Sequence, residues 1–150
     1  MELSKFLVKA RINTYASVGE GKEDEVRALE DGSIEFVYEE NGFRYRDRYF
    51  GFDPFIGEEI VWQNGEVIWG MNYYGRITSN VVPEKQVYEF LRKALRQVTE
   101  DRPFRGNNFR EGDFEYINES KGTIKSFNGV ERVLHKGQEI YRLNYHGGSF

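Results

Sequence analysis

Residues 69–76 read WGMNYYGR and residues 141–148 read YRLNYHGG, so an Asn-Tyr pair followed by a ring and a glycine occurs twice in the chain. The similarity continues upstream at a nearly constant spacing, with a single change of register. Self-similarity of this kind is typical of an internal repeat. The identical pairs are Phe43 and Phe114, Tyr45 and Tyr116, Gly51 and Gly122, Phe55 and Phe127, Gly57 and Gly129, Glu59 and Glu131, Val61 and Val133, Gly65 and Gly137, Ile68 and Ile140, Asn72 and Asn144, Tyr73 and Tyr145, and Gly75 and Gly147.

Each half begins with a segment that has the spacing of an amphipathic helix. Leu3, Phe6, Leu7 and Ala10 follow the i, i+3, i+4, i+7 pattern, which places them on one helical face. The second segment follows Pro83, a residue type that favours the first turn of a helix. Its apolar positions are Val87, Phe90, Leu91, Ala94, Leu95 and Val98. The similarity of KFLVKA in the first segment to EFLRKA in the second supports the repeat.

Short runs rich in β-branched and aromatic residues predict antiparallel strands in both halves. The runs are IEFVY, FRYRDRYF, EEIVW and EVIWGMNYY, then DFEYI, TIKSF, VERVLH and EIYRLNY. Asn-Gly pairs favour tight hairpins, because both residues tolerate a positive φ. The predicted turns are Asn41-Gly42, Asn64-Gly65, Lys121-Gly122, Asn128-Gly129 and Lys136-Gly137. The polar, acidic residues 17–31 are predicted to form a long surface loop.

One such unit has a single helix to cover three or four strands, which is a marginal core. We therefore predict an α+β fold made of a tandem duplicated helix-plus-antiparallel-meander unit, with two helices packed on one face of a curved antiparallel sheet. The prediction is a single domain over residues 1–150, with internal repeats at about 1–78 and 84–150. The opposite face of the sheet would then be free for function.

Composition narrows the class of protein. The 150 residues, 39% of them hydrophobic, provide for one buried core. A formal net charge of −4 argues against a protein whose main role is to neutralise phosphates. The chain contains no cysteine, which excludes disulfides, thiolate metal sites and a cysteine nucleophile. No apolar run has the length of a membrane span or a signal-peptide core, so we expect a cytoplasmic protein with no membrane partner, no cofactor and no metal.

Alternation along the last strand of each half separates two faces. Val67, Trp69, Met71 and Tyr73 share an apolar face that we predict to be core. The opposite face carries the candidate binding residues Asn72, Tyr74, Arg76, Asn144 and His146. Asparagine is depleted in strands, and we favour a buried amide network over a ligand contact as the reason for these two. Positions at which the halves differ are the better functional candidates, since a unique site needs only one copy.

Glu59 and Glu131 occupy matched positions in the motif Phe-x-Gly-x-Glu. We favour a structural role, in which each carboxylate accepts backbone N–H bonds at a bulge. The alternative is that the two carboxylates meet across a pseudo-two-fold axis, for acid-base chemistry or a metal ion. A small enzyme would then use His146 with Glu59 or Glu131.

Arg44, Arg46 and Arg48 form a basic stripe on one side of the run FRYRDRYF, and this stripe has no copy in the second half. It suits an anionic ligand, an acidic partner or single-stranded nucleic acid. We favour the alternative of cross-strand pairing with acidic neighbours such as Glu35 and Glu39. Pairing of all three arginines would remove the nucleic-acid hypothesis.

Taken in order, YRDRYFG, FIGEEIVW, WGMNYYGR, DRPFRG, EGDFEY and NYHGG resemble an uncharacterised bacterial and archaeal domain family. Its members are similar over nearly the full length of this chain, and they occur alone or behind an Xre-type helix-turn-helix segment. The resemblance implies a sensor or partner-binding domain of regulators, with no established catalytic residues. This chain starts directly at the first α-β unit, so we do not expect a role in transcription.

The favoured hypothesis is a non-enzymatic binding or sensor module that recognises a small molecule or a protein segment. Its binding residues would be Asn72, Tyr74, Arg76, Asn144, His146, Arg44 and Arg46. The alternatives are a small enzyme that uses His146, and a weak nucleic-acid binder that uses the arginine stripe. The sequence leaves the ligand and the oligomeric state open, including whether the chain forms a homodimer.

Overall fold

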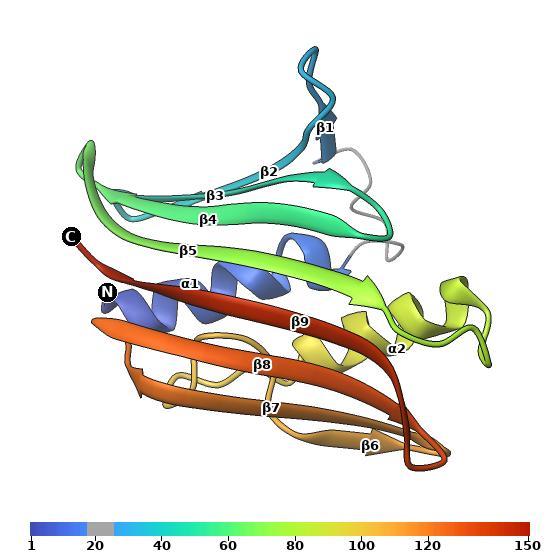
Figure 1. Ribbon diagram of the computed structural model, residues 1–150. Coiled ribbons are helices and arrows are strands. Elements are labelled where there is room, and N and C mark those ends of the chain that lie inside the picture. Colours follow the sequence, from blue (N-terminus) through green and yellow to red (C-terminus); the bar gives the residue numbers. More distant parts are fainter. Residues whose placement is uncertain (18–25) are drawn as a thin grey trace.

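The computed structural model describes residues 1–17 and 26–150, in which two α-helices and nine strands form a single antiparallel sheet covered on one face (Figure 1). The helices are α1 (Leu3–Ile12) and α2 (Glu84–Leu95), with a short 3-10 turn η1 (Tyr15–Ser17). The strands are β1 (Val26–Ala28), β2 (Ile34–Glu40), β3 (Phe43–Gly51), β4 (Phe55–Gln63), β5 (Glu66–Ile77), β6 (Phe109–Glu111), β7 (Phe114–Thr123), β8 (Ser126–His135) and β9 (Gln138–Ser149). The predicted α+β class is confirmed.

The two halves meet at the centre of the sheet. The strand order β1-β2-β3-β4-β5-β9-β8-β7-β6 places the last strand of each half side by side. In that central pair Tyr73 of β5 lies directly opposite Tyr145 of β9, and these are matched positions in the sequence. A gene duplication would produce this symmetry. The duplication stays a prediction.

Three tight hairpins form where the sequence places residues that tolerate a positive φ. Asn41 and Gly42, with φ of 52° and 82°, connect β2 to β3. Asn64-Gly65 connects β4 to β5, and Lys136-Gly137 connects β8 to β9, with the same signs of φ. Both central residues of a type I′ turn need a positive φ, so these three predicted turns are explained by local chemistry.

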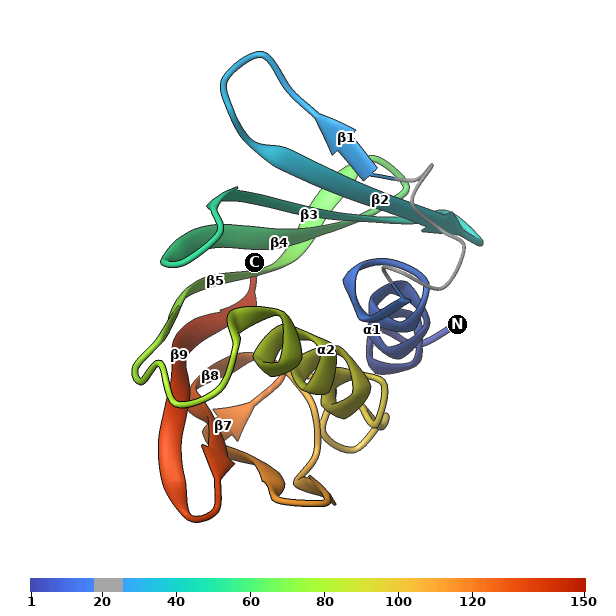
Figure 2. The same cartoon turned by 90° about the vertical axis from the view of Figure 1, so that its right-hand side faces the viewer.

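Both helices pack against the concave face, and Figure 2 shows the sheet wrapped around α1 and α2. Phe6 and Leu7 of α1 and Leu91 and Ala94 of α2 are fully buried. Burial of one such leucine or phenylalanine stabilises the fold by about 1.5–3 kcal/mol. Within residues 1–17 and 26–150, no helix covers the convex face, and no helix is long and apolar enough to cross a membrane.

Three predictions about strands and turns are wrong. The run TIKSF is not a strand, because residues 123–126 form the turn between β7 and β8. Asn128-Gly129 is not a turn but lies inside β8, where Gly129 makes room for the Tyr145 ring, and Lys121-Gly122 likewise lies inside β7. A methyl group at residue 129 would lie 2.2 Å from that ring, so the glycine here permits close packing between strands.

Two smaller corrections concern the first half. Part of the predicted loop 17–31 is strand β1, while residues 18–25 of that prediction lie outside the described residues. Val67, predicted to be core, is 43% exposed. A bulge between Val61 and Trp62 pairs Trp62 with Val67 and leaves Ile68 as the extra residue. The alternation of β5 therefore changes phase at this point.

Candidate functional site

The convex face of the sheet carries the residues that the sequence singled out for binding. Asn72, Tyr74 and Arg76 of β5 and Asn144 and His146 of β9 are all exposed. The register pairs Asn72 with His146 and Tyr74 with Asn144 across the central strands. Because the two asparagines are exposed, the buried amide network expected for them is wrong, and both amides are available to a partner.

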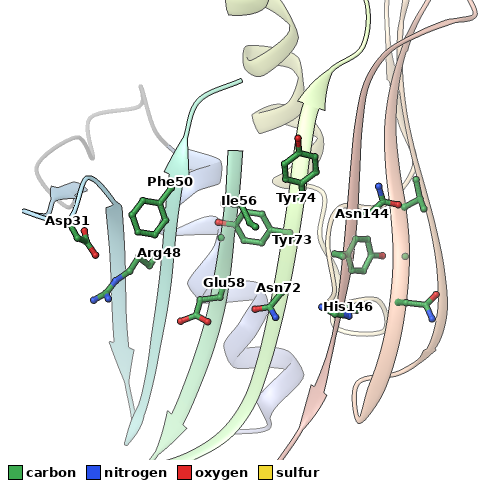
Figure 3. Close-up of a pocket in the computed structure, with 15 residues that line it drawn as sticks. Asp31, Arg48, Phe50, Ile56, Glu58, Asn72, Tyr73, Tyr74, Asn144 and His146 are labelled. Atoms are coloured by element: carbon green, nitrogen blue, oxygen red, sulfur yellow. The ribbon is translucent and has the colours of Figure 1, made fainter. Parts of the chain in front are cut away.

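An open hollow of about 1040 Å³ lies over this face, lined by Asn72, Tyr74, Asn144 and His146 among others. Figure 3 shows Glu58, Asn72 and His146 in one row across β4, β5 and β9, in agreement with the pairing of these strands. The row therefore presents a carboxylate, an amide and an imidazole to solvent. Such groups bind the hydrogen-bonding atoms of a polar chain.

An apolar row runs beside these polar groups. Phe50 of β3 lies opposite Ile56 of β4, which lies opposite Tyr74 of β5. Their side chains are 42%, 55% and 45% exposed, so three large apolar groups on neighbouring strands face solvent together. Contiguous exposed apolar surface next to polar groups is typical of interaction sites.

A row of arginines borders the apolar row. Arg76 of β5 lies directly opposite Arg142 of β9, and Arg142 lies opposite Arg132 of β8. Arg142 pairs with Glu139 at 2.8 Å and Arg132 with Glu119 at 3.4 Å. Among the described residues, Arg76 makes no ion pair. Arg76 is therefore the guanidinium of this row that is available to an anionic partner.

The arginine stripe of β3 is arranged differently, because each guanidinium has an acidic neighbour. The ion pairs are Arg44 with Glu39 at 3.4 Å, Arg46 with Glu58 at 3.1 Å and Arg48 with Glu35 at 2.8 Å. Arg44 and Arg46 also stack against Trp62. The favoured expectation of cross-strand pairing agrees with this arrangement, and the hypothesis of a nucleic-acid binder loses its support.

Glu59 and Glu131 lie on the concave face, on the side of the sheet opposite His146, and are 2% and 0% exposed. The Arg11 Nη2 atom donates to Glu59 at 2.6 Å, and the Arg105 Nη2 atom donates to Glu131 at 2.7 Å. The partners are therefore guanidinium groups and not the backbone N–H groups we expected. Arg105 lies between the two carboxylates, 3.9 Å from Glu59 and 2.7 Å from Glu131. Both glutamates are buried on the face opposite the exposed His146, so the structure does not bring His146 together with either of them.

Asp47 is a buried acid on the concave face that was not predicted as a site residue from the sequence. The Tyr73 hydroxyl donates to its Oδ1 atom at 2.5 Å. Burial and the nearby Glu59 carboxylate raise the pKa of Asp47 to about 7. A signal was present in the sequence, because Asp47 alternates with Phe43 and Tyr45 and so lies on the same face as these core residues.

Comparison with curated proteins and comparison with solved structures each give no match. One family model, described as a domain of unknown function (DUF5680), matches residues 47–150. The matched segment begins at Asp47 within β3 and includes α2 and the central pair β5 and β9. It thus contains the whole set of exposed residues described above for those two strands. The chain belongs to the DUF5680 family, a family of unknown function.

Proposed function

We propose that this protein is a non-enzymatic binding module whose convex sheet face receives an acidic segment of a protein partner. The single observation that carries the proposal is Arg76, which is exposed on β5 beside exposed apolar side chains and makes no ion pair among the described residues. It lies opposite Arg142, whose charge is paired with Glu139. An acidic partner would supply the counter-charge that Arg76 lacks.

The shape of the face favours a protein over a small molecule. Small-molecule sites bury about 70–90% of the ligand surface, which an open hollow does not do. A protein interface needs a broad surface of about 800 Å² on each partner, with aromatic and arginine anchors near its centre. Tyr74 and Arg142 on the two central strands are anchors of this kind. Asn72, Asn144 and His146 would provide hydrogen bonds around them.

A duplicated origin of the chain is part of the proposal. Its support is a set of matched interactions on the concave face. The carboxylates of Glu59 and Glu131 each bind a buried arginine. Tyr73 of β5 donates to Asp47 of β3 and Tyr145 of β9 donates to Asn118 of β7, so each hydroxyl reaches across one intervening strand. If members of the family serve regulators, as the sequence resemblance implies, such a module would act as a sensor of its protein partner.

Selection of a random peptide library on the purified protein at low salt tests the proposal. We expect enriched peptides to combine Asp or Glu with apolar residues. Loss of one interface arginine costs more than about 1 kcal/mol at a hot spot, so Arg76→Ser should weaken binding by roughly tenfold. Lys85→Ser, on the solvent side of α2, is the control and should leave affinity unchanged. Peptides without acidic residues, or equal binding by Arg76→Ser, would overturn the proposal.

A further inference from the structure

A separate cavity of about 190 Å³ lies on the concave side of the sheet, between the strands of the first half and the helices. Its aromatic lining includes Phe36, Tyr49, Phe55 and Tyr88. An engineered apolar cavity of about 150 Å³ is known to bind benzene, so a space of this size holds one or two planar rings. The cavity is smaller and less open than the hollow on the convex face.

Asp47 forms the polar end of this cavity. Its carboxyl group is 5% exposed and lies directly opposite Glu59 in the sheet register. Among the described residues, the Tyr73 hydroxyl is the one hydrogen-bond donor that reaches it. A buried carboxylate commonly accepts several hydrogen bonds, so Asp47 has acceptor capacity left for a ligand.

The three buried acids near the cavity differ in their partners. Glu59 accepts from Arg11 and lies 3.9 Å from Arg105, whose guanidinium donates to both oxygens of Glu131. Arg92 and Arg105 line the same cavity as Asp47, but among the described residues neither donates a hydrogen bond to it. The Asp47 carboxyl group therefore either keeps a proton or accepts a donor from a ligand.

The second half of the chain shows what occupies the corresponding place there. Asn118 takes the position of Asp47, and its Oδ1 atom accepts from the Tyr145 hydroxyl at 2.7 Å. The Asn118 Nδ2 atom donates to the Gly106 carbonyl at 2.8 Å. Phe104, two residues before Gly106, stacks on Phe127 with 4.5 Å between the ring centroids. The chain itself thus supplies a ring and a hydrogen-bonding group.

In the first half, Phe55 and Asp47 are the counterparts of Phe127 and Asn118, and both line the cavity. We propose that the cavity binds a planar nitrogen heterocycle of one or two rings, with its ring against Phe55 and an N–H group donating to Asp47. Arg92 and Arg105 also line the cavity, which favours a neutral or weakly basic ring over a strong cation. This site is separate from the convex face and does not depend on the function proposed for that face.

Indole and its N–H-free isostere indene are the matched probes. Isothermal titration calorimetry and the shift in melting temperature should show indole binding about tenfold tighter than indene, since only indole can donate to Asp47. Benzoate, an acceptor without an N–H group, should bind more weakly than both. Equal binding of indole and indene, tighter binding of benzoate, or no binding of indole would overturn the proposal.

A cavity-filling variant tests whether indole binds in this cavity. Leu91 of α2 is fully buried and lines the cavity, so Leu91→Phe should fill it and weaken indole binding by more than tenfold. Leu7→Phe is the same change on α1, at a fully buried residue that does not line this cavity, and it should keep indole affinity. A crystal structure of the unmodified protein soaked with indole is independent of either variant. Indole found elsewhere, or retained by Leu91→Phe, would refute this site.

Discussion

Replacement of Asp47 by asparagine should stabilise the protein at neutral and alkaline pH. The folded protein disfavours the ionised carboxylate, because Asp47 is buried and lies opposite Glu59. Asparagine has nearly the same shape, and its oxygen still accepts the Tyr73 hydroxyl. The pair Asn118 and Tyr145 shows this arrangement in the second half.

The sign and the size of the effect follow from the pKa of Asp47, which is raised from 3.8 to about 7. Between these two values the folded state holds a proton that the unfolded chain has released. The free energy of unfolding therefore falls as pH rises through the window from about 4 to 7. The full difference is on the order of 4 kcal/mol above pH 7. Arg11 and Arg105, which also face Asp47, lower its pKa and are already included in that value.

Urea denaturation of the wild type and Asp47→Asn from pH 4 to pH 9 measures this difference directly. The two proteins should be about equally stable near pH 4, and the variant should become more stable as pH rises to 8. Asn118→Asp is the converse change, and it should lose stability over the same rise in pH. If the difference between wild type and Asp47→Asn does not change with pH, or if the variant is less stable at pH 8, the reasoning is wrong.

Two further changes test the packing of the concave face. Glu131→Gln should cost about 3–5 kcal/mol, because the buried Arg105 loses its hydrogen-bonded carboxylate and keeps the Glu59 carboxylate at 3.9 Å. Glu119→Gln, at an exposed ion pair, should cost less than about 1 kcal/mol, and equal losses in urea denaturation would contradict the buried network. Gly129→Ala should cost about 1–3 kcal/mol, because its methyl group would lie 2.2 Å from the Tyr145 ring. An unchanged melting temperature for Gly129→Ala would show that the ring moves freely.

Local chemistry made much of the fold predictable. A positive φ at both residues of Asn41-Gly42 and Asn64-Gly65 fixes two hairpins, and helical periodicity places α1 and α2. The same signal failed at Asn128-Gly129, which lies within β8. There the glycine serves the Tyr145 ring of the neighbouring strand, and a contact between strands leaves no mark in the adjacent residues.

The candidate site was predictable in one respect only. Strand alternation placed Asn72, Tyr74 and His146 on the face opposite the core, and all three are exposed there. Alternation did not reveal that Arg76 and Arg142 lie directly opposite each other, because the register between β5 and β9 depends on tertiary pairing. It also did not reveal the cavity, whose volume depends on how α2 packs against the sheet.

The burial of the charged residues on the concave face could also be predicted from the sequence. Arg11 follows Leu7 by one helical turn, and Glu59 and Asp47 alternate with core residues, so each position reads as buried from periodicity. A buried charge needs a partner. Arg11 and Arg105 donate hydrogen bonds to Glu59 and Glu131, and among the described residues neither donates one to Asp47. Asp47 lines the cavity in the first half. In the second half the matched residue is the neutral Asn118, whose amide donates to the Gly106 carbonyl. A carboxyl group to which no guanidinium donates a hydrogen bond among the described residues therefore lines a cavity, and one ligand would both fill the cavity and donate to the carboxyl group.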